Sequence, residues 1–283
     1  MNTKIKSSYL KTFLCMLLLL PLLFVFTACG EEVGQLDTKA SCDTSGTYGA
    51  STKTEYDNAM NGITGFVNDS YRITMSVSVE SVTKIGTKHT WSIDLNGIFT
   101  PEGYAFKGKM KATGAYADKT ISGNLVSGSF TYYYKNGIVY KNENNKKSYE
   151  SAGYNDLLNV VLLNNFYAPT KILPVVTEGT GVSYEKNGSK YQMTVTTVNN
   201  LNLLQAWEEH STVTTKPAFV YVNLTEDKKL DALKLTTQAD RTGSEFYGTK
   251  YAGDDYTTTM KVNVTMSAFD GQIEFPDPTE FNK

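Results

Sequence analysis

Apolar and polar residues alternate one by one along several stretches of this 283-residue chain. The clearest runs are 72–80, 191–195 and 260–266. In the first of them the apolar positions are Ile73, Met75, Val77 and Val79. Because successive side chains of a β-strand point to opposite faces of a sheet, this period predicts antiparallel strands with one apolar and one solvated face.

Shorter runs of the same kind extend the predicted sheet. They lie at 91–95, 104–112, 125–134, 138–141, 219–224 and 230–237. Two Asn-Gly pairs, which begin at Asn136 and Asn187, are typical of tight hairpin turns, in which positive φ is needed at the turn positions. Every proline beyond the first 30 residues falls between or after these runs, where its missing N–H breaks no strand pairing.

Three segments depart from this period and are predicted to be helical. Residues 56–67 carry apolar side chains at helical spacing, 154–166 are apolar nearly all round, and 201–209 form a shorter amphipathic candidate. The apolar face of the sheet needs a cover, and an all-round apolar helix needs a concave partner. The sequence therefore predicts an α+β fold, in which one large curved antiparallel sheet, a half-barrel, wraps around two or three helices.

The first 28 residues have the layout of an export signal. Three lysines and no acidic residue precede or flank an apolar run over 13–26, which is shorter than the ~20 residues of a membrane-spanning helix. The Phe-Thr-Ala-Cys segment that ends at Cys29 resembles the lipobox of bacterial lipoproteins, with phenylalanine where these usually carry leucine. The resemblance implies a lipoprotein signal peptide over 1–28 and an acyl lipid, such as one carrying palmitate, on Cys29. It also implies an extracytoplasmic domain anchored to the cell membrane or outer membrane of a bacterium.

Composition divides the rest of the chain. Residues 29–53 are rich in Gly, Ser, Thr and acidic side chains and lack an apolar period, which predicts a flexible tether. Cys42 in this segment is expected to be an exposed thiol. Residues 54–283 show no second linker and no internal repeat, which favours one β-rich domain. This domain contains no cysteine, so its stability has to come from packing.

The order of elements and two short phrases resemble the LolA and LolB lipoprotein carriers, together with the lipidated LppX/LprG proteins. The phrases are Tyr-Lys-Asn-Gly-Ile-Val-Tyr-Lys at 134–141 and Ile-Glu-Phe-Pro at 273–276, within a resemblance over roughly 55–276. It implies a lipid or acyl ligand in an apolar cavity. The candidate lining is Met75, Val77, Val79, Leu157, Leu158, Val161, Leu162 and Met266. The same residues could instead fill a closed core, and the sequence leaves both alternatives open.

The sequence contains no H-E-x-x-H, C-x-x-C, G-x-S-x-G or EF-hand pattern. The histidines, His89 and His210, lack ligand spacing and are interpreted as surface or helix-end residues. Residues 103–109 match G-x-x-x-x-G-K, but Met110 stands where a phosphate loop needs Ser or Thr, and the segment alternates as a strand. The sequence favours a protein that is not an enzyme and uses no metal or cofactor. A hydrolase whose residues meet only in the fold is a weaker third hypothesis.

The charge and the tyrosine content limit which kinds of binding partner are expected. Without the leader, 24 basic residues face 29 acidic ones, and this net charge of −5 disfavours nucleic acid. Four of the 19 tyrosines gather on one predicted hairpin: Tyr132, Tyr133, Tyr134 and Tyr140. Aromatic rings on a strand surface can stack on sugars or anchor a protein, although they are also ordinary strand formers. The alternative function is therefore a non-catalytic surface module that binds glycan or protein through exposed tyrosines.

Overall fold

The computed structural model describes residues 39–62, 69–117, 127–153, 179–198, 212–215, 217–242 and 255–281. The chain forms two compact units. One comprises Val33–Asp270 and Phe275–Lys283 and contains every helix and strand named below. The other comprises Met1–Glu32 and Gly271–Glu274, of which only the last four residues are described. The predicted leader, Cys29 and the predicted helices at 154–166 and 201–209 lie outside the described residues.

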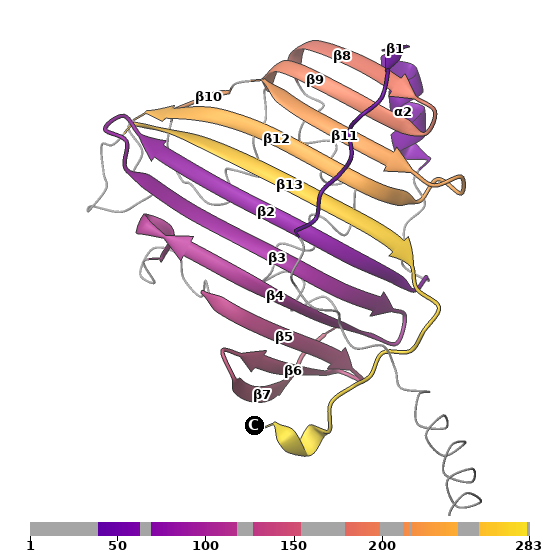
Figure 1. The fold of residues 1–283 in the computed structure, drawn as a ribbon, viewed down its shortest axis with the longest axis vertical. Coiled ribbons are helices and arrows are strands. Elements are labelled where there is room, and N and C mark those ends of the chain that lie inside the picture. Colours follow the sequence, from indigo (N-terminus) through magenta and orange to yellow (C-terminus); the bar gives the residue numbers. More distant parts are fainter. Residues whose placement is uncertain are drawn as a thin grey trace, which may run out of the picture. The chain divides into compact units, whose positions relative to one another are not determined.

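Thirteen strands form one antiparallel sheet (Figure 1). They are β1 (Gly49–Ser51), β2 (Tyr71–Thr83), β3 (Lys88–Thr100), β4 (Gly103–Thr113), β5 (Gly128–Lys135), β6 (Ile138–Glu143), β7 (Lys146–Ser151), β8 (Gly179–Asn187), β9 (Lys190–Val198), β10 (Thr212–Thr215), β11 (Ala218–Leu224), β12 (Leu230–Thr242) and β13 (Tyr256–Ala268). Their order across the sheet is β1-β8-β9-β11-β12-β13-β2-β3-β4-β5-β6-β7, and β10 pairs with β12 beside this row. Within the described residues the sheet is open, with β1 and β7 at its edges. This confirms the prediction of one large antiparallel sheet.

The one-by-one alternation sets which side chains the sheet buries. Along β2 every second residue is buried, from Tyr71 to Thr83. The buried positions of the neighbouring strands line up with those of β2: Met75 lies opposite Val264 on β13 and Leu95 on β3. We call the face that carries Met75 the inner face and the opposite one the outer face. Each predicted strand has a counterpart in the described residues, although residues 125–126 of the strand predicted at 125–134 lie outside them. Strands β1, β7, β8 and β10 were not predicted.

The hairpin turns follow from residues that tolerate positive φ. Asn136 and Gly137 join β5 to β6 with φ values of 52° and 78°, as the Asn-Gly pair predicts. Asn144 and Asn145 join β6 to β7 with φ values of 51° and 67°. Asparagine is among the few non-glycine residues that adopt this conformation readily, which explains how the second turn forms without glycine.

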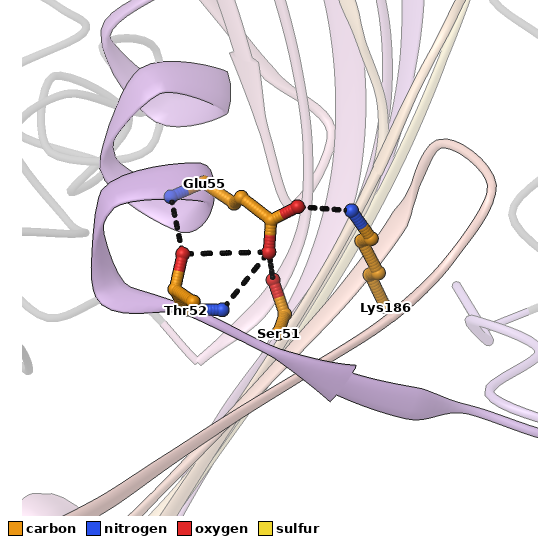
Figure 2. Close-up of polar contacts among 4 residues, drawn as sticks. All are labelled: Ser51, Thr52, Glu55 and Lys186. Atoms are coloured by element: carbon orange, nitrogen blue, oxygen red, sulfur yellow. Dashed lines mark hydrogen bonds and ion pairs between the residues drawn. The ribbon is translucent and has the colours of Figure 1, made fainter.

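Helix α2 (Lys53–Asn61) confirms the first part of the helix predicted at 56–67; residues 63–68 lie outside the described part of the chain. Thr52 caps its N-terminus: the hydroxyl accepts from the Glu55 N–H, and the Glu55 carboxylate accepts from the Thr52 N–H (Figure 2). Ser51 and Lys186 donate to the same carboxylate, so the cap also ties the helix to β8.

Helix α2 packs on the inner face near the β1 edge. Its Tyr56 ring lies 5.2 Å from the Tyr184 ring on β8 and 6.3 Å from the Tyr191 ring on β9, measured between centroids. Tyr56 and Met60 are the buried residues of the helix. Burial raises the pKa of the Tyr56 hydroxyl well above its usual range. Among the described residues α2 is the single α-helix on this face.

Residues 39–48 cross the outer face as an irregular segment, here called the strap, and lead into β1 (Figure 1). The Ala40 N–H donates to Ser76 Oγ on β2 at 3.0 Å. The Cys42 thiol donates to the carbonyls of Leu233 on β12 (3.0 Å) and Val264 on β13 (3.3 Å). These contacts fix the strap across three neighbouring strands.

Cys42 is therefore not an exposed thiol, and that prediction is wrong. Its side chain is 6% exposed and packs with Tyr221 and Ala232 on the outer face. Burial raises the pKa of this thiol, which makes it a weak nucleophile. Within the described part of the predicted tether, Ala40 and Cys42 are buried and hydrogen-bonded to the sheet, and Gly49–Ser51 pair with β8 as β1.

Candidate functional site

The structure brings the described candidate lining residues together on the inner face. Met75, Val77 and Val79 lie on β2 and Met266 on β13, and all are buried. Apolar partners surround them in register, because Val77 lies opposite Val262 and Ile93. The other candidates, Leu157, Leu158, Val161 and Leu162, lie outside the described residues. The face is thus apolar across its centre.

One end of the inner face is aromatic. A row of four rings crosses β2, β3, β4 and β5, and we call it the aromatic row. It consists of Tyr71, Phe99, Tyr104 and Tyr134, which are register partners in that order. The three successive ring centroids are 5.2, 5.6 and 5.2 Å apart, and the first and last pairs are stacked. Rings at this spacing contact one another directly, so the row is a packed structural layer.

The other end of the inner face carries buried polar side chains. The register places Ala239, Thr258, Ser81 and His89 in one row across β12, β13, β2 and β3, which we call the hydroxyl row. The Ser81 hydroxyl lies 2.8 Å from Thr258 Oγ1 and 3.1 Å from the Tyr116 hydroxyl, and both hydrogen bonds are buried. Three hydroxyls thus meet on the buried face.

Thr237 adds an unsatisfied group beside this row. It lies on β12 opposite Met260, two residues before Ala239, and is 5% exposed. Its Oγ1 has no hydrogen-bond partner in the part of the chain that the structure describes. Leaving a buried hydroxyl without a hydrogen bond costs about 1–3 kcal/mol of folding free energy. A hydrogen-bond partner at this position would remove that cost.

A 3₁₀ turn, η2 (Gly114–Ala117), folds over the hydroxyl row. Gly114 has a φ of +61°, and a Cβ there would lie 2.1 Å from His89 Nδ1, so only glycine fits. The turn aims the Ala115 N–H at His89 Nδ1, at 3.0 Å, and brings Tyr116 to Ser81. His89 is 2% exposed, so its interpretation as a surface residue is wrong.

The histidine is neutral in this arrangement. A charged imidazolium donates from both nitrogens and has no lone pair to offer. Because His89 Nδ1 accepts from the Ala115 N–H, the ring carries its proton on Nε2. The described side chains of the hydroxyl row therefore carry no charge.

Sequence reasoning missed these residues, although a signal was present. Ser81 and Thr83 continue the parity of the apolar positions on β2, and Thr258 does so on β13. A small hydroxyl residue in an apolar register marks a buried polar position. The predicted runs, 72–80 and 260–266, stopped short of these positions.

The four tyrosines of the predicted hairpin divide between the two faces. Tyr132 and Tyr134 lie on the inner face, whereas Tyr133 and Tyr140 are register partners on the outer face. The Tyr140 ring packs edge-on against Phe281, at 5.3 Å between centroids. A surface module that binds a partner through these rings would therefore use Tyr133 and Tyr140, and not all four tyrosines.

The remaining motifs give no further site. Residues 103–110 lie within β4, which confirms the prediction of a strand there. The described residues contain no group of three or more His, Cys, Asp or Glu side chains placed to hold a metal. Among the same residues, no helix has the length and apolarity to cross a membrane.

Comparison with known proteins gives weak structural likenesses. No family model matches the sequence, and no curated protein matches it. The chain is similar to the crystal structure of LprF from Mycobacterium bovis, with a TM-score of 0.37 and 12% identity over 81% of this chain and 99% of that one. It is also similar to a LolA superfamily protein from Nitrosomonas europaea, with a TM-score of 0.22 and 9% identity over 83% and 99% of the two chains.

A third likeness is to a DUF1329 family protein from Desulfovibrio piger, with a TM-score of 0.22 and 9% identity over 80% of this chain and 95% of that one. Scores this low carry no argument about function. The proposals below therefore rest on the geometry of this chain.

Proposed function

We propose that this protein is a non-catalytic carrier that binds a lipid or acyl ligand against the inner face of its sheet. The observation that supports the proposal is the division of that face. Apolar side chains cover its centre, and a buried hydroxyl row lies at one end. An amphipathic ligand has the same division, with an apolar chain joined to a polar group. Sites for such ligands are mostly apolar and carry a few placed polar groups.

The dimensions of the face fit an acyl chain. Ten residue steps along β2, from Tyr71 to Ser81, separate the two rows. A strand of that length extends about 33 Å. One acyl chain covers half of the ~30 Å bilayer core, or about 15 Å. An extended chain can thus lie along β2 with its polar end at the hydroxyl row and without reaching the aromatic row.

The test is a mass comparison on the full chain purified from its own host. Native mass spectrometry is expected to show a species heavier than the denatured protein by one acyl lipid, and organic extraction is expected to release that lipid. Identical native and denatured masses, with nothing in the extract, would show that the inner face is a closed core.

We further propose that the carrier is anchored outside the cytoplasm through an acyl lipid on Cys29. Nine residues, 30–38, separate Cys29 from the strap. Fully extended, a connection of this length reaches about 33 Å. The strap would therefore hold the sheet close to the membrane surface. In a lipoprotein the lipid is attached to the cysteine thiol, and the signal peptide is removed only after that. Cys29→Ser is therefore expected to leave a longer, uncleaved precursor, measured by intact mass. A mature protein with unmodified Cys29 would contradict this.

A further inference from the structure

The hydroxyl row is polar and uncharged at Ser81 and Thr258, so it can recognise a polar group of the ligand as well as its apolar chain. We propose that Ser81, Thr258, Tyr116 and Thr237 bind an uncharged, oxygen-bearing polar group of the ligand, such as a glyceryl ester or hydroxyl. This inference rests on the proposed function and names the ligand class for the same face.

Thr237 supplies the first argument. The residue is 5% exposed, and its buried hydroxyl has no partner within the described residues, although the neighbouring hydroxyls are hydrogen-bonded. Burial of such a group without a partner costs free energy that a purely structural core would avoid by using valine. A ligand oxygen beside β12 would satisfy it.

The hydroxyls of Ser81 and Thr258 have spare hydrogen-bonding capacity. Each of them offers one donor and two acceptor lone pairs. Ser81 uses two of these positions, on Thr258 and Tyr116, and Thr258 uses one, on Ser81. Hydroxyls rotate to donate or accept as required, so the cluster suits an ester or an alcohol equally.

The absence of charge in the described row supplies the third argument. His89 is neutral because its Nδ1 accepts from Ala115, and the other members of the row carry no charge. A carboxylate or phosphate buried here would have no paired cation among the described side chains, so its desolvation would be unfavourable. Arg241 lies two residues beyond Ala239 on β12, in register with Tyr256. The binding experiment therefore also includes a variant of Arg241.

Trp91 provides a local reporter. It lies on the inner face of β3, two residues from His89 and opposite Val79. In the full chain with Trp207→Phe and Cys29→Ser, Trp91 is the single tryptophan and no acyl group can attach to residue 29. The probes are dibrominated stearic acid and its monoglyceride, because bromine quenches tryptophan fluorescence at short range. The two probes differ only in the polar group.

We expect the monoglyceride to quench Trp91 at about tenfold lower concentration than the acid, which corresponds to one or two hydrogen bonds. Thr258→Val and Ser81→Ala are expected to weaken the monoglyceride about fivefold and to leave the acid unchanged. Thr265→Val, on the outer face of the same strand, is the matched control and should change neither probe.

The outcomes separate the two proposals. Equal binding of both probes, unaffected by Thr258→Val, would keep the carrier function and overturn the assignment of the hydroxyl row. Tighter binding of the acid that is lost in Arg241→Gln would overturn it in favour of a charged contact at the sheet end. Quenching by neither probe would remove the carrier function together with this inference. The comparison of probes on the unchanged row keeps the test valid if a variant fails to fold.

Discussion

The aromatic row and the hydroxyl row lie on one face of the sheet and share strands β2 and β3, and they differ in how closely their side chains pack. In the aromatic row each ring stacks or tilts onto the next, at 5.2–5.6 Å between centroids. In the hydroxyl row Ser81 and Thr258 have small side chains joined by a hydrogen bond, and one hydroxyl beside the row, that of Thr237, has no partner within the described residues. The alternation of the sequence determines the face of a side chain, whereas its chemical type determines whether that part of the face packs or binds.

The largest effect is expected at the aromatic row. Phe99 lies between Tyr71 and Tyr104, so Phe99→Ala removes two ring contacts and leaves a cavity. The free energy of unfolding should fall by about 3–5 kcal/mol, measured by urea denaturation. Phe99→Leu keeps most of the volume and should cost clearly less. A loss below about 1 kcal/mol for the alanine variant would mean that this row is not a packed layer.

Gly114→Ala should come next, because it disturbs the turn that covers the hydroxyl row. Its matched control is Gly137→Ala: both glycines have positive φ, but a Cβ at Gly137 has no atom within 4 Å. The control should lose about 1 kcal/mol through its backbone conformation alone. Gly114→Ala should lose at least twice as much, because the new Cβ would displace His89. Equal thermal stability of the two variants would contradict the contact between η2 and His89.

Thr258→Val should have a smaller effect on stability. Valine has nearly the same shape as threonine, and Ser81 keeps its hydrogen bond to Tyr116. We expect a change of about 1 kcal/mol or less in the free energy of unfolding. The contrast with Phe99→Ala is what the comparison of the two rows predicts. A loss as large as that of Phe99→Ala would make the hydroxyl row a structural element like the aromatic one.

The smallest effect is expected away from both rows, at the cap of α2. The Lys186 ammonium, with help from Thr52 and Ser51, lowers the pKa of Glu55 to about 2 (Figure 2). Because this pKa lies below the unfolded value of 4.5, the carboxylate stabilises the fold fully above pH 4.5. That contribution is lost as the pH falls toward 2. Glu55→Gln should remove this pH dependence from the unfolding midpoint and leave ligand binding unchanged.

Local patterns predicted much of the sheet. The alternation in 72–80 and 260–266 determined both the strands and their buried faces, because every second side chain of a strand faces the same way. The Asn-Gly pair at Asn136 predicted its hairpin for the same local reason. The turn at Asn144 and Asn145 was missed, and β7 with it, because two asparagines were not considered as a hairpin turn.

Long-range contacts explain the other misses. Strand β1 has three residues and pairs with β8 more than 130 positions away, so nothing near it in the sequence specifies a strand. Composition alone suggested that the segment around Cys42 is a tether, but hydrogen bonds to Leu233 and Val264 fix it to the sheet. The hydroxyl row was missed because Ser81 and Thr258 meet only through strand register, across 177 positions of sequence.

The central claim is that the inner face holds an acyl ligand. The most direct measurement is the native mass of the full chain purified from its own host, compared with its denatured mass. A lipid bound covalently to Cys29 adds the same mass to the native and the denatured protein. Only a ligand held non-covalently by the fold makes the native mass larger than the denatured mass. We predict a difference equal to one acyl lipid with an uncharged polar group, recovered by organic extraction. Equal masses and an empty extract would contradict the claim.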